Sequence, residues 1–377
     1  MKIVFLSNYL NHHQKPLSDE LYRLTEGNYT YIDTAPMSEV RHKLGYRELD
    51  APYMIKCYNH PTPPSEIAKI IDEADAVIIG SAPDSYITSR TKAGKLTFKY
   101  SERLYKSEPS KFKLLYHRWR FHRNYSRNPN CYLLCASAYT ASDYHRIGCF
   151  VGRAFKWGYF PAVEDCTSSE NTLEAPYQKN SKLKILWVGR FLNWKHPELP
   201  VALAKKLKAD FVDFELNMYG IGEEYERIGK MIADNGLTDR VKLCGSTHNE
   251  EILRQMRSHD ILLFTSDRNE GWGAVANEAM GSRCVLVASD AIGSTPFLIE
   301  NGVNGMVFRN ENLNDLYKQV KYLIDNPEQR MQIAENAYRT VHDLWSPVNA
   351  ARSIISLITG HMNGQITPTV KGPGSIA

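Results

Sequence analysis

Short apolar runs alternate with amphipathic stretches along most of this chain. Residues 2–7 and 75–80 are largely apolar runs, rich in Val and Ile, of the kind that forms buried strands. Residues 65–74, between them, carry apolar side chains at helical spacing. The second half resumes the same alternation at residue 183. Strands that alternate with helices predict parallel sheets with helices packed against them.

The same pattern predicts the individual elements. In the first half, we expect strands at residues 2–7, 29–33, 75–80, 96–100, 131–136 and 155–160, with helices at residues 15–24 and 65–74. In the second half, we expect strands at residues 183–188, 214–219, 241–244, 260–265 and 284–288. The helices expected there are residues 197–207, 223–234, 249–257, 274–281, 312–325, 328–344 and 347–359.

The length of the chain and the repetition of this alternation predict two domains, because a single core rarely serves 377 residues. We expect an α/β fold of two Rossmann-like domains, each with a doubly wound parallel sheet, facing a cleft. The N-terminal domain is predicted at residues 1–161, a linker at 162–181 and the C-terminal domain at 182–345. A helix at residues 346–362 is expected to follow, and residues 363–377, which are rich in Gly, Pro and Thr, are expected to form a flexible tail.

Composition excludes several classes of protein. With 43% hydrophobic and 23% charged residues, the chain has an ordinary globular composition. None of its apolar runs approaches the roughly 20 residues that a membrane-spanning helix needs, and the first run is too short for a signal peptide. The seven cysteines form no C-x-x-C pair, so reduced thiols in a cytoplasmic protein are expected. No Asp-x-Asp occurs, so we expect no metal ion on a bound diphosphate.

The strongest chemical signal surrounds two glycines that follow a predicted buried strand. Gly271 and Gly273 let the backbone approach a ligand closely, and the helix after them offers unpaired N–H groups and a positive dipole end. An anionic diphosphate is the natural ligand. Glu278, further along that helix, is within reach of a ribose diol, and Glu270 lies at the loop before it. The alternative interpretation is a simple turn followed by a solvated helix.

A second signal follows the first strand of the predicted C-terminal domain. That strand ends in glycine, and Arg190 and Lys195 then lie on the loop that leads into a helix. A departing nucleoside diphosphate gains negative charge, and two fixed cations are the expected metal-free means of stabilising it. Arg and Lys on loops usually face water, so the signal gains its weight from the glycine motif that accompanies it.

These two segments, in this order, resemble the retaining GT-B glycosyltransferases of the family called glycosyl transferases group one. The resemblance covers residues 182–358 well and the N-terminal half only in architecture. Glu270 and Glu278 match the family's E-x7-E motif, which implies that Glu270 contacts hydroxyls of the donor sugar and Glu278 the ribose. Arg190 and Lys195 match its diphosphate-binding pair, which makes Glu270, Arg190 and Lys195 the expected catalytic residues.

The resemblance also implies the remaining donor contacts. The backbone of Gly271, Trp272, Gly273 and Ala274 would bind phosphate or sugar oxygens. Gly220, in a Gly-x-Gly turn, and Gly245, in the segment that lines the nucleobase pocket, complete the donor-binding set. The C-terminal domain would therefore hold the donor, and the final helix would cross back to the N-terminal domain.

The N-terminal half departs from the family in two places. Many relatives carry a Gly-Gly pair in the first loop, where this chain has Asn11, His12 and His13. A histidine often found midway through that domain has no obvious counterpart, and Asp84 and Glu102 are the candidates there. These five residues are our expected acceptor side, although His12 and His13 could equally be structural residues of the loop.

Positive charge is concentrated in one segment. Residues 88–130 hold twelve Lys and Arg against two Glu, whereas the whole chain has a formal charge of +4. Eight Phe, Tyr and Trp side chains are interleaved with these cations. Such a pattern suits anionic membrane lipid, a lipid-diphosphate acceptor or nucleic acid, and we favour lipid and expect no nucleic acid. The alternative is a solvated face with its aromatic side chains directed inward.

Taken together, these patterns predict a retaining hexosyltransferase that uses a nucleoside-diphosphate sugar, UDP- or GDP-linked, and no cofactor. The expected acceptor is a saccharide or a polyprenyl-diphosphate-linked precursor in surface-polysaccharide or glycolipid biosynthesis. The protein is expected in the cytoplasm, with the inner face of the cell membrane as a docking surface. A sugar-nucleotide epimerase of the same fold and a non-catalytic protein that binds anionic polymer or membrane are the alternatives.

Overall fold

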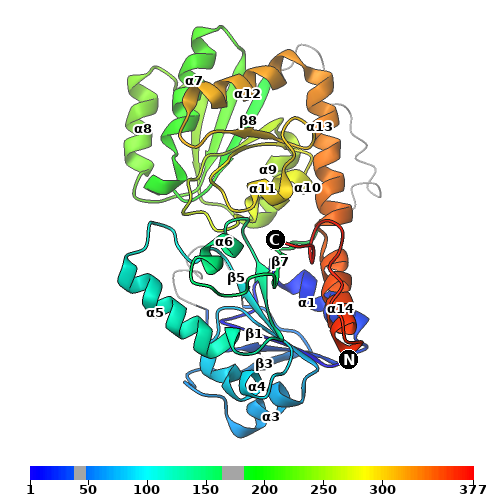
Figure 1. The fold of residues 1–377 in the computed structure, drawn as a ribbon. Helices are drawn as coiled ribbons and strands as arrows, with labels where there is room; N and C mark the ends of the chain where they lie inside the picture. Colours follow the sequence, from blue (N-terminus) through cyan, green and yellow to red (C-terminus); the bar gives the residue numbers. More distant parts are fainter. Residues whose placement is uncertain (38–47, 164–181) are drawn as a thin grey trace. The chain divides into compact units, whose positions relative to one another are not determined.

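The computed structural model describes residues 1–37, 48–163 and 182–377. The chain divides into two compact units (Figure 1). The first unit consists of Met1–Ala162 together with Leu344–Ala377, and the second of Val163–Asp343. Most of the expected linker, residues 164–181, lies outside the described residues. Each unit contains one parallel sheet, so the predicted α/β class with two Rossmann-like domains is confirmed.

The first unit is built on a seven-stranded sheet in which all neighbouring strands are parallel, in the order β3-β2-β1-β4-β5-β6-β7. The strands are β1 (Ile3–Ser7), β2 (Tyr29–Asp33), β3 (Met54–Lys56), β4 (Ala76–Ile79), β5 (Thr97–Ser101), β6 (Cys131–Cys135) and β7 (Ala154–Lys156). β1 and β4 are buried along their whole length, as the Val/Ile runs predicted. β3 was not predicted, because this three-residue strand is too short to show a period.

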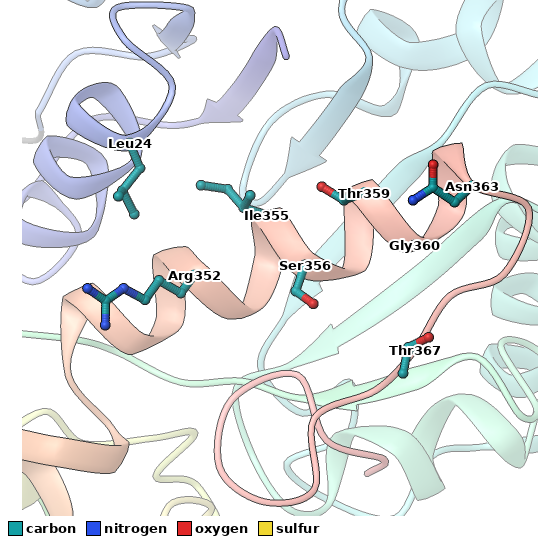
Figure 2. Close-up of a pocket in the computed structure, with 8 residues that line it drawn as sticks. All are labelled: Leu24, Arg352, Ile355, Ser356, Thr359, Gly360, Asn363 and Thr367. Carbon is teal, nitrogen blue, oxygen red and sulfur yellow. The ribbon is translucent and has the colours of Figure 1, made fainter.

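Helices and short turns connect these strands. They are α1 (Lys15–Leu24), α3 (Ser65–Glu73), η1 (Asp84–Ile87), α4 (Thr88–Lys92), α5 (Lys111–Phe121), η2 (His122–Ser126), α6 (Thr140–His145) and α14 (Pro347–Met362). α14 packs alongside α1, which ties the C-terminal helix to the first unit (Figure 1). A pocket of about 430 Å³ borders this pair, lined by Leu24 of α1, by side chains of α14 such as Arg352 and Ser356, and by Thr367 (Figure 2).

The expectation of a flexible tail at residues 363–377 is wrong. Residues 372–375 are buried, and Ile376 forms an antiparallel bridge with Phe155 of β7. Lys156 N–H donates to the Ser375 carbonyl at 2.7 Å, and Gly374 N–H donates to the Lys156 carbonyl at 2.8 Å. β7 is the last strand of the sheet, so its unpaired backbone groups offer this segment partners that its composition does not reveal.

The second unit has six parallel strands in the order β10-β9-β8-β11-β12-β13. The strands are β8 (Leu183–Val188), β9 (Phe214–Tyr219), β10 (Val241–Gly245), β11 (Ile261–Phe264), β12 (Val285–Ser289) and β13 (Met306–Phe308). The connecting elements are η3 (Asn193–Lys195), α7 (Glu198–Ala209), α8 (Tyr225–Asp234), α9 (Asn249–Ser258), α10 (Val275–Gly281), α11 (Thr295–Leu298), α12 (Leu313–Asp325), α13 (Pro327–Arg339) and η4 (Thr340–Leu344). β13 was not predicted because it is as short as β3.

The structure also bears on the cysteines and on membrane-spanning helices. Among the described cysteines, all six are free thiols, and Cys166 lies outside the described residues. Within residues 1–37, 48–163 and 182–377, no helix is both long enough and apolar enough to cross a bilayer.

Arg90 is part of the core of the first unit, although the sequence placed it in the basic segment. Its side chain is fully buried on α4. The guanidinium donates to the backbone carbonyls of Ile71, Ala74, Asp75 and Leu96 over 2.7–3.2 Å. Burial lowers its pKa to about 10, so it remains a cation at neutral pH. Arg90 therefore joins the end of α3 to the start of β5.

We predict that Arg90→Met destabilises the first unit by about 3–5 kcal/mol, because four buried carbonyls lose their donors. Urea unfolding followed by circular dichroism measures the change. Lys92→Met, at an exposed position on the same helix, is the matched control and should shift the unfolding midpoint little. Equal midpoints for the two variants would contradict the structural role of Arg90.

Candidate active site

The strand order of the second unit brings the loops of the two sequence motifs together. β8 and β11 are neighbours in the sheet, although they are the first and fourth strands of this unit along the chain. In an open parallel sheet, such a reversal of strand order creates a crevice at the carboxyl ends of the strands, where ligands bind. Arg190 and Lys195 lie after β8, and Glu270 lies after β11. The three expected catalytic residues thus share one edge of one sheet.

Lys195 and Glu270 form an ion pair across this edge. Their side chains are only 14% and 11% exposed, so neither charge is well solvated. Ser266 Oγ donates a further hydrogen bond of 3.0 Å to the Glu270 carboxylate, and the Lys195 ammonium lies 4.7 Å from the ring centre of Trp194. A buried carboxylate without such partners would be costly, so the pair holds both loops in place.

A buried relay fixes the backbone at Lys195. Trp187 of β8 donates through Nε1 to Thr265 Oγ1 at 2.9 Å, and Thr265 Oγ1 donates to the Lys195 carbonyl at 2.7 Å. Both side chains are buried. Trp187 on β8 and Thr265, which follows β11, therefore position the loop that carries Lys195.

Arg190 differs from Lys195 in its surroundings. Its side chain is exposed, and no ion pair or side-chain hydrogen bond engages it among the described residues. Its own loop is nevertheless fixed, because Phe191 N–H donates to the Ile221 carbonyl at 3.0 Å and Phe191 is fully buried. Arg190 is therefore a cation on a fixed backbone, which is an arrangement suited to an anionic ligand.

The glycine turn after Glu270 is sterically constrained. Gly273 has φ +76°, and a Cβ there would lie 2.3 Å from Cζ of Phe264. Trp272 is completely buried and donates through Nε1 to Asn277 Oδ1 at 2.8 Å. The Trp272 side chain thus anchors the turn, and only its backbone is placed to contact a donor. Gly271 and Ala274 are also buried, with Ala274 at the start of α10.

Glu278 lies on α10, where it is half-buried. Burial raises the pKa of its carboxyl to about 7, against a hydrogen bond with Asn249 that lowers it. The protonation of this group therefore changes near neutral pH. A carboxylate there can accept two hydroxyl hydrogen bonds, as a ribose diol would supply.

The loops after β8, β9 and β10 approach one another through glycines. A Cβ on Gly220 would lie 1.9 Å from the Gly189 carbonyl oxygen, so no larger residue fits. Gly220 N–H donates to the Gly245 carbonyl at 2.7 Å. Gly245, with φ +68°, has open space at its Cβ position. These two expected donor-binding glycines are therefore in direct backbone contact.

Four of the five expected acceptor-side residues lie at the carboxyl ends of β1 and β5 in the first unit. Asn11 Oδ1 accepts from the His13 N–H at 3.0 Å, so its side chain shapes the turn before α1. The ring of His13 is stacked with Tyr159, with ring centres 6.1 Å apart, and is 3.8 Å from that of His12. Glu102 accepts a hydrogen bond from the Tyr159 hydroxyl. Tyr159, which sequence reasoning missed, thus links the two loops.

Asp84, the fifth residue expected on the acceptor side, is engaged by side chains of α5 and η2. Its carboxylate accepts from Arg120 at 2.7 and 2.9 Å, from Asn124 at 3.1 Å and from the Tyr125 hydroxyl. Burial alone would raise its pKa, but these hydrogen bonds and the charges of Lys99 and Arg120 lower it below its ordinary value. Asp84 therefore fastens α5 and η2 to the unit.

Sequence reasoning also missed His196, which follows Lys195. It is buried, adopts a left-handed conformation at φ 49°, and contacts Glu198 Oε1 through Nδ1 at 2.9 Å. This hydrogen bond raises the pKa of His196 above its ordinary value. The proline at 197 disfavours a right-handed helical conformation at His196, but it does not predict the left-handed conformation observed there. His196 fixes the turn that presents Lys195.

Comparison with solved structures defines the class of this fold. The crystal structure of Anabaena HepE in complex with UDP matches with a TM-score of 0.72 and 16% sequence identity, covering 96% of this chain and 100% of the other. A second structure of HepE, in complex with UDP-glucose, matches with a TM-score of 0.67. The chain therefore has a GT-B fold, which consists of two Rossmann-like units. Arg190, Lys195 and Glu270 lie at the strand ends of the second unit.

Sequence comparison points to one family over part of the chain. Residues 169–340 match the model described as glycosyl transferases group 1. Over 151 residues the chain is 30% identical to an uncharacterized glycosyltransferase of Methanocaldococcus jannaschii, covering 40% of this chain and 41% of that relative. Over 224 residues it is 28% identical to the alpha-D-kanosaminyltransferase of Streptomyces kanamyceticus, covering 59% and 54%. The matches thus span about half the length of these relatives.

We predict that Gly273→Ala destabilises the second unit by about 2–4 kcal/mol, since it adds a clash with Phe264 to the cost of a left-handed alanine. Gly245→Ala is the matched control, because its φ is similar and its Cβ position is open. Gly245→Ala should lower the free energy of unfolding only by the cost of a left-handed alanine, about 1–2 kcal/mol. Thermal unfolding of both variants measures the difference. Identical shifts would mean that Phe264 yields and the turn is not constrained.

Proposed function

We propose that this protein is a retaining glycosyltransferase that moves a hexose from a nucleoside-diphosphate sugar to a saccharide or lipid-linked acceptor. The meeting of Arg190, Lys195 and Glu270 at the ends of β8 and β11 carries this proposal. Two cations suit a diphosphate, and a carboxylate suits the hydroxyls of a sugar. The family of residues 169–340 supports the same chemistry.

The proposed transfer balances without a cofactor or a nucleophile from the protein. The bond between the anomeric carbon and a diphosphate oxygen breaks, and an acceptor hydroxyl oxygen bonds to that carbon. The hydroxyl proton passes to the departing phosphate oxygen. Because the new bond forms on the face that the diphosphate leaves, the configuration is retained. Arg190 and Lys195 stabilise the charge that grows on the diphosphate, so catalysis consists of positioning and electrostatics.

A UDP-linked donor is our first choice, with a GDP-linked donor as the alternative. The HepE structures with UDP and with UDP-glucose support this choice, since their fold matches over nearly the whole chain. In this proposal Glu278 accepts hydrogen bonds from the ribose, and the backbone around Gly220 and Gly245 receives the nucleobase.

The first unit would present the acceptor. His12, His13 and Glu102, connected through Tyr159, offer polar side chains at the carboxyl edge of its sheet. A growing saccharide of a surface polysaccharide or a glycolipid, free or carried on a polyprenyl diphosphate, fits this chemistry. The reaction would then take place in the cytoplasm or at the inner face of the cell membrane.

The donor assignment predicts a pH dependence. Ribose hydroxyls favour the charged form of Glu278, whose pKa is about 7 in the free protein. UDP affinity should therefore rise with pH and level off above 7, by at most about tenfold per unit below the pKa. Glu278→Gln should weaken UDP binding by about 1.5–3 kcal/mol at pH 8 and flatten this profile.

Calorimetric titration with UDP between pH 6 and 8 measures both effects. Glu226→Gln, at an exposed position on α8, is the matched control and should keep the wild-type profile. An unchanged profile in a folded Glu278→Gln variant would refute the ribose assignment.

The charge assignment predicts a loss of turnover without a loss of stability. Arg190→Ala should lower kcat about 100- to 1000-fold, as removal of one transition-state donor does, while its exposed position leaves the unfolding temperature unchanged. Lys195→Ala should lower both kcat and the unfolding temperature, because Glu270 then remains buried without its cationic partner.

Release of UDP with and without acceptor, over a panel of UDP- and GDP-sugars, measures turnover, and proton NMR of the product reports the anomeric configuration. Lys205→Ala, at an exposed position on α7, is the control. Wild-type kcat in Arg190→Ala would remove the leaving-group role, and an inverted product would overturn the retaining mechanism.

A further inference from the structure

One face of α5 exposes an apolar stripe. Phe112, Leu115, Tyr116 and Trp119 are 85%, 64%, 55% and 58% exposed. Their spacing of three and four residues puts them on one side of the helix. The rings of Tyr116 and Trp119 lie 6.2 Å apart, so the stripe is continuous there. A contiguous exposed patch of large apolar side chains marks an interaction surface.

The opposite face of α5 is firmly attached to the first unit. Phe121 is buried against the ring of Tyr144 at 4.9 Å, and His117 is stacked on Tyr105 at 5.4 Å. On the flank of α5 that also carries Lys113, Arg120 is bound by Asp84, as described above. α5 is therefore attached to the first unit by one face and exposes the stripe on another. Figure 1 shows where α5 lies in the first unit.

Cations border the stripe on both sides. At 100° per residue, Lys113 lies on one side of it and Lys111 and Arg118 lie on the other, and all three are exposed. The Arg123 guanidinium, one turn further along, lies 5.5 Å from the ring of Trp119. No Asp or Glu occurs between Glu108 and Asp143. The charged side chains that α5 and η2 themselves contribute beside the stripe are therefore all cations.

We propose that α5 docks the protein on an anionic lipid surface, with the stripe in the headgroup–acyl boundary and the bordering cations on lipid phosphates. A bilayer interface accepts both parts, since Trp and Tyr favour that depth and Lys and Arg reach the headgroups. A second copy of this chain would bring like charges together. An anionic polymer would satisfy the charges but leave Phe112 and Leu115 in water. At eleven residues, α5 is far too short to span a bilayer.

The proposal is tested by cosedimentation with vesicles of phosphatidylcholine, with and without phosphatidylglycerol, in 0.1 M and 0.5 M salt. We expect binding only to the anionic vesicles, weakened at high salt. Lys111→Gln, Lys113→Gln and Arg118→Gln together should lower the affinity about 100-fold, at roughly fivefold per cation. Arg120 is left unchanged because Asp84 needs it. The triple variant Lys205→Gln, Lys230→Gln and Lys318→Gln, with the same charge change on exposed positions of the second unit, should bind as wild type.

The contribution of the apolar stripe is tested separately. Phe112→Ser, Leu115→Ser and Trp119→Ser together should lower vesicle affinity at least tenfold, whereas Phe211→Ser with Met331→Ser, at exposed positions elsewhere, should not. Equal binding to neutral vesicles, no binding by the wild type, or unchanged binding in either α5 variant would overturn the proposal. So would a dimer, seen by analytical ultracentrifugation, that the serine variant abolishes. The vesicle assay needs no donor, and UDP calorimetry on each variant keeps failure of docking distinct from failure of the proposed transfer.

Discussion

The ion pair between Lys195 and Glu270 is the constraint on which the candidate site depends. It joins the loops after β8 and β11, two strands that are neighbours in the sheet but far apart along the chain. Because both side chains are mostly buried, neither loop can move away without leaving an uncompensated charge. The Trp187–Thr265 relay and the turn at His196 support the same geometry. The protein therefore maintains this edge of the sheet before any ligand arrives.

The geometry at this edge also separates two kinds of cation. Lys195 is mostly buried and paired with Glu270, whereas Arg190 is exposed on a fixed backbone. A ligand phosphate would pair with Arg190 at little cost, but it would compete with Glu270 for Lys195. If a sugar hydroxyl takes over part of the Glu270 carboxylate, Lys195 is released toward the phosphate. Binding of a sugar hydroxyl at Glu270 and binding of a phosphate at Lys195 would thus be coupled through the Lys195 ammonium group.

Much of the second unit could be predicted from the sequence, because the hydrophobic pattern that marks its strands and helices is local along the chain. The apolar run at residues 260–265 and the family resemblance placed Glu270, Gly273 and Glu278 after a buried strand. That β8 and β11 are neighbours, which brings Lys195 to Glu270, became evident only in the structure. Side-chain environment was less predictable, since it depends on distant partners. Arg90 lies in the basic segment, yet it is buried and donates to a backbone carbonyl of α3. Asp84 lies in a polar stretch, yet side chains of α5 and η2 engage its carboxylate. Trp272 lies in the turn that we expected to bind the donor, yet its indole is buried in the core and donates to Asn277.

The pairing of residues 374–377 with β7 has a consequence for synthesis on the ribosome. The second unit is one continuous segment and can fold as soon as it emerges. The sheet of the first unit, made earlier, must wait through the translation of about 180 further residues before α14 and the segment after it arrive. Until then the edge of β7 offers open backbone groups to any neighbouring strand. The nascent first unit is therefore open to non-native strand pairing during that interval.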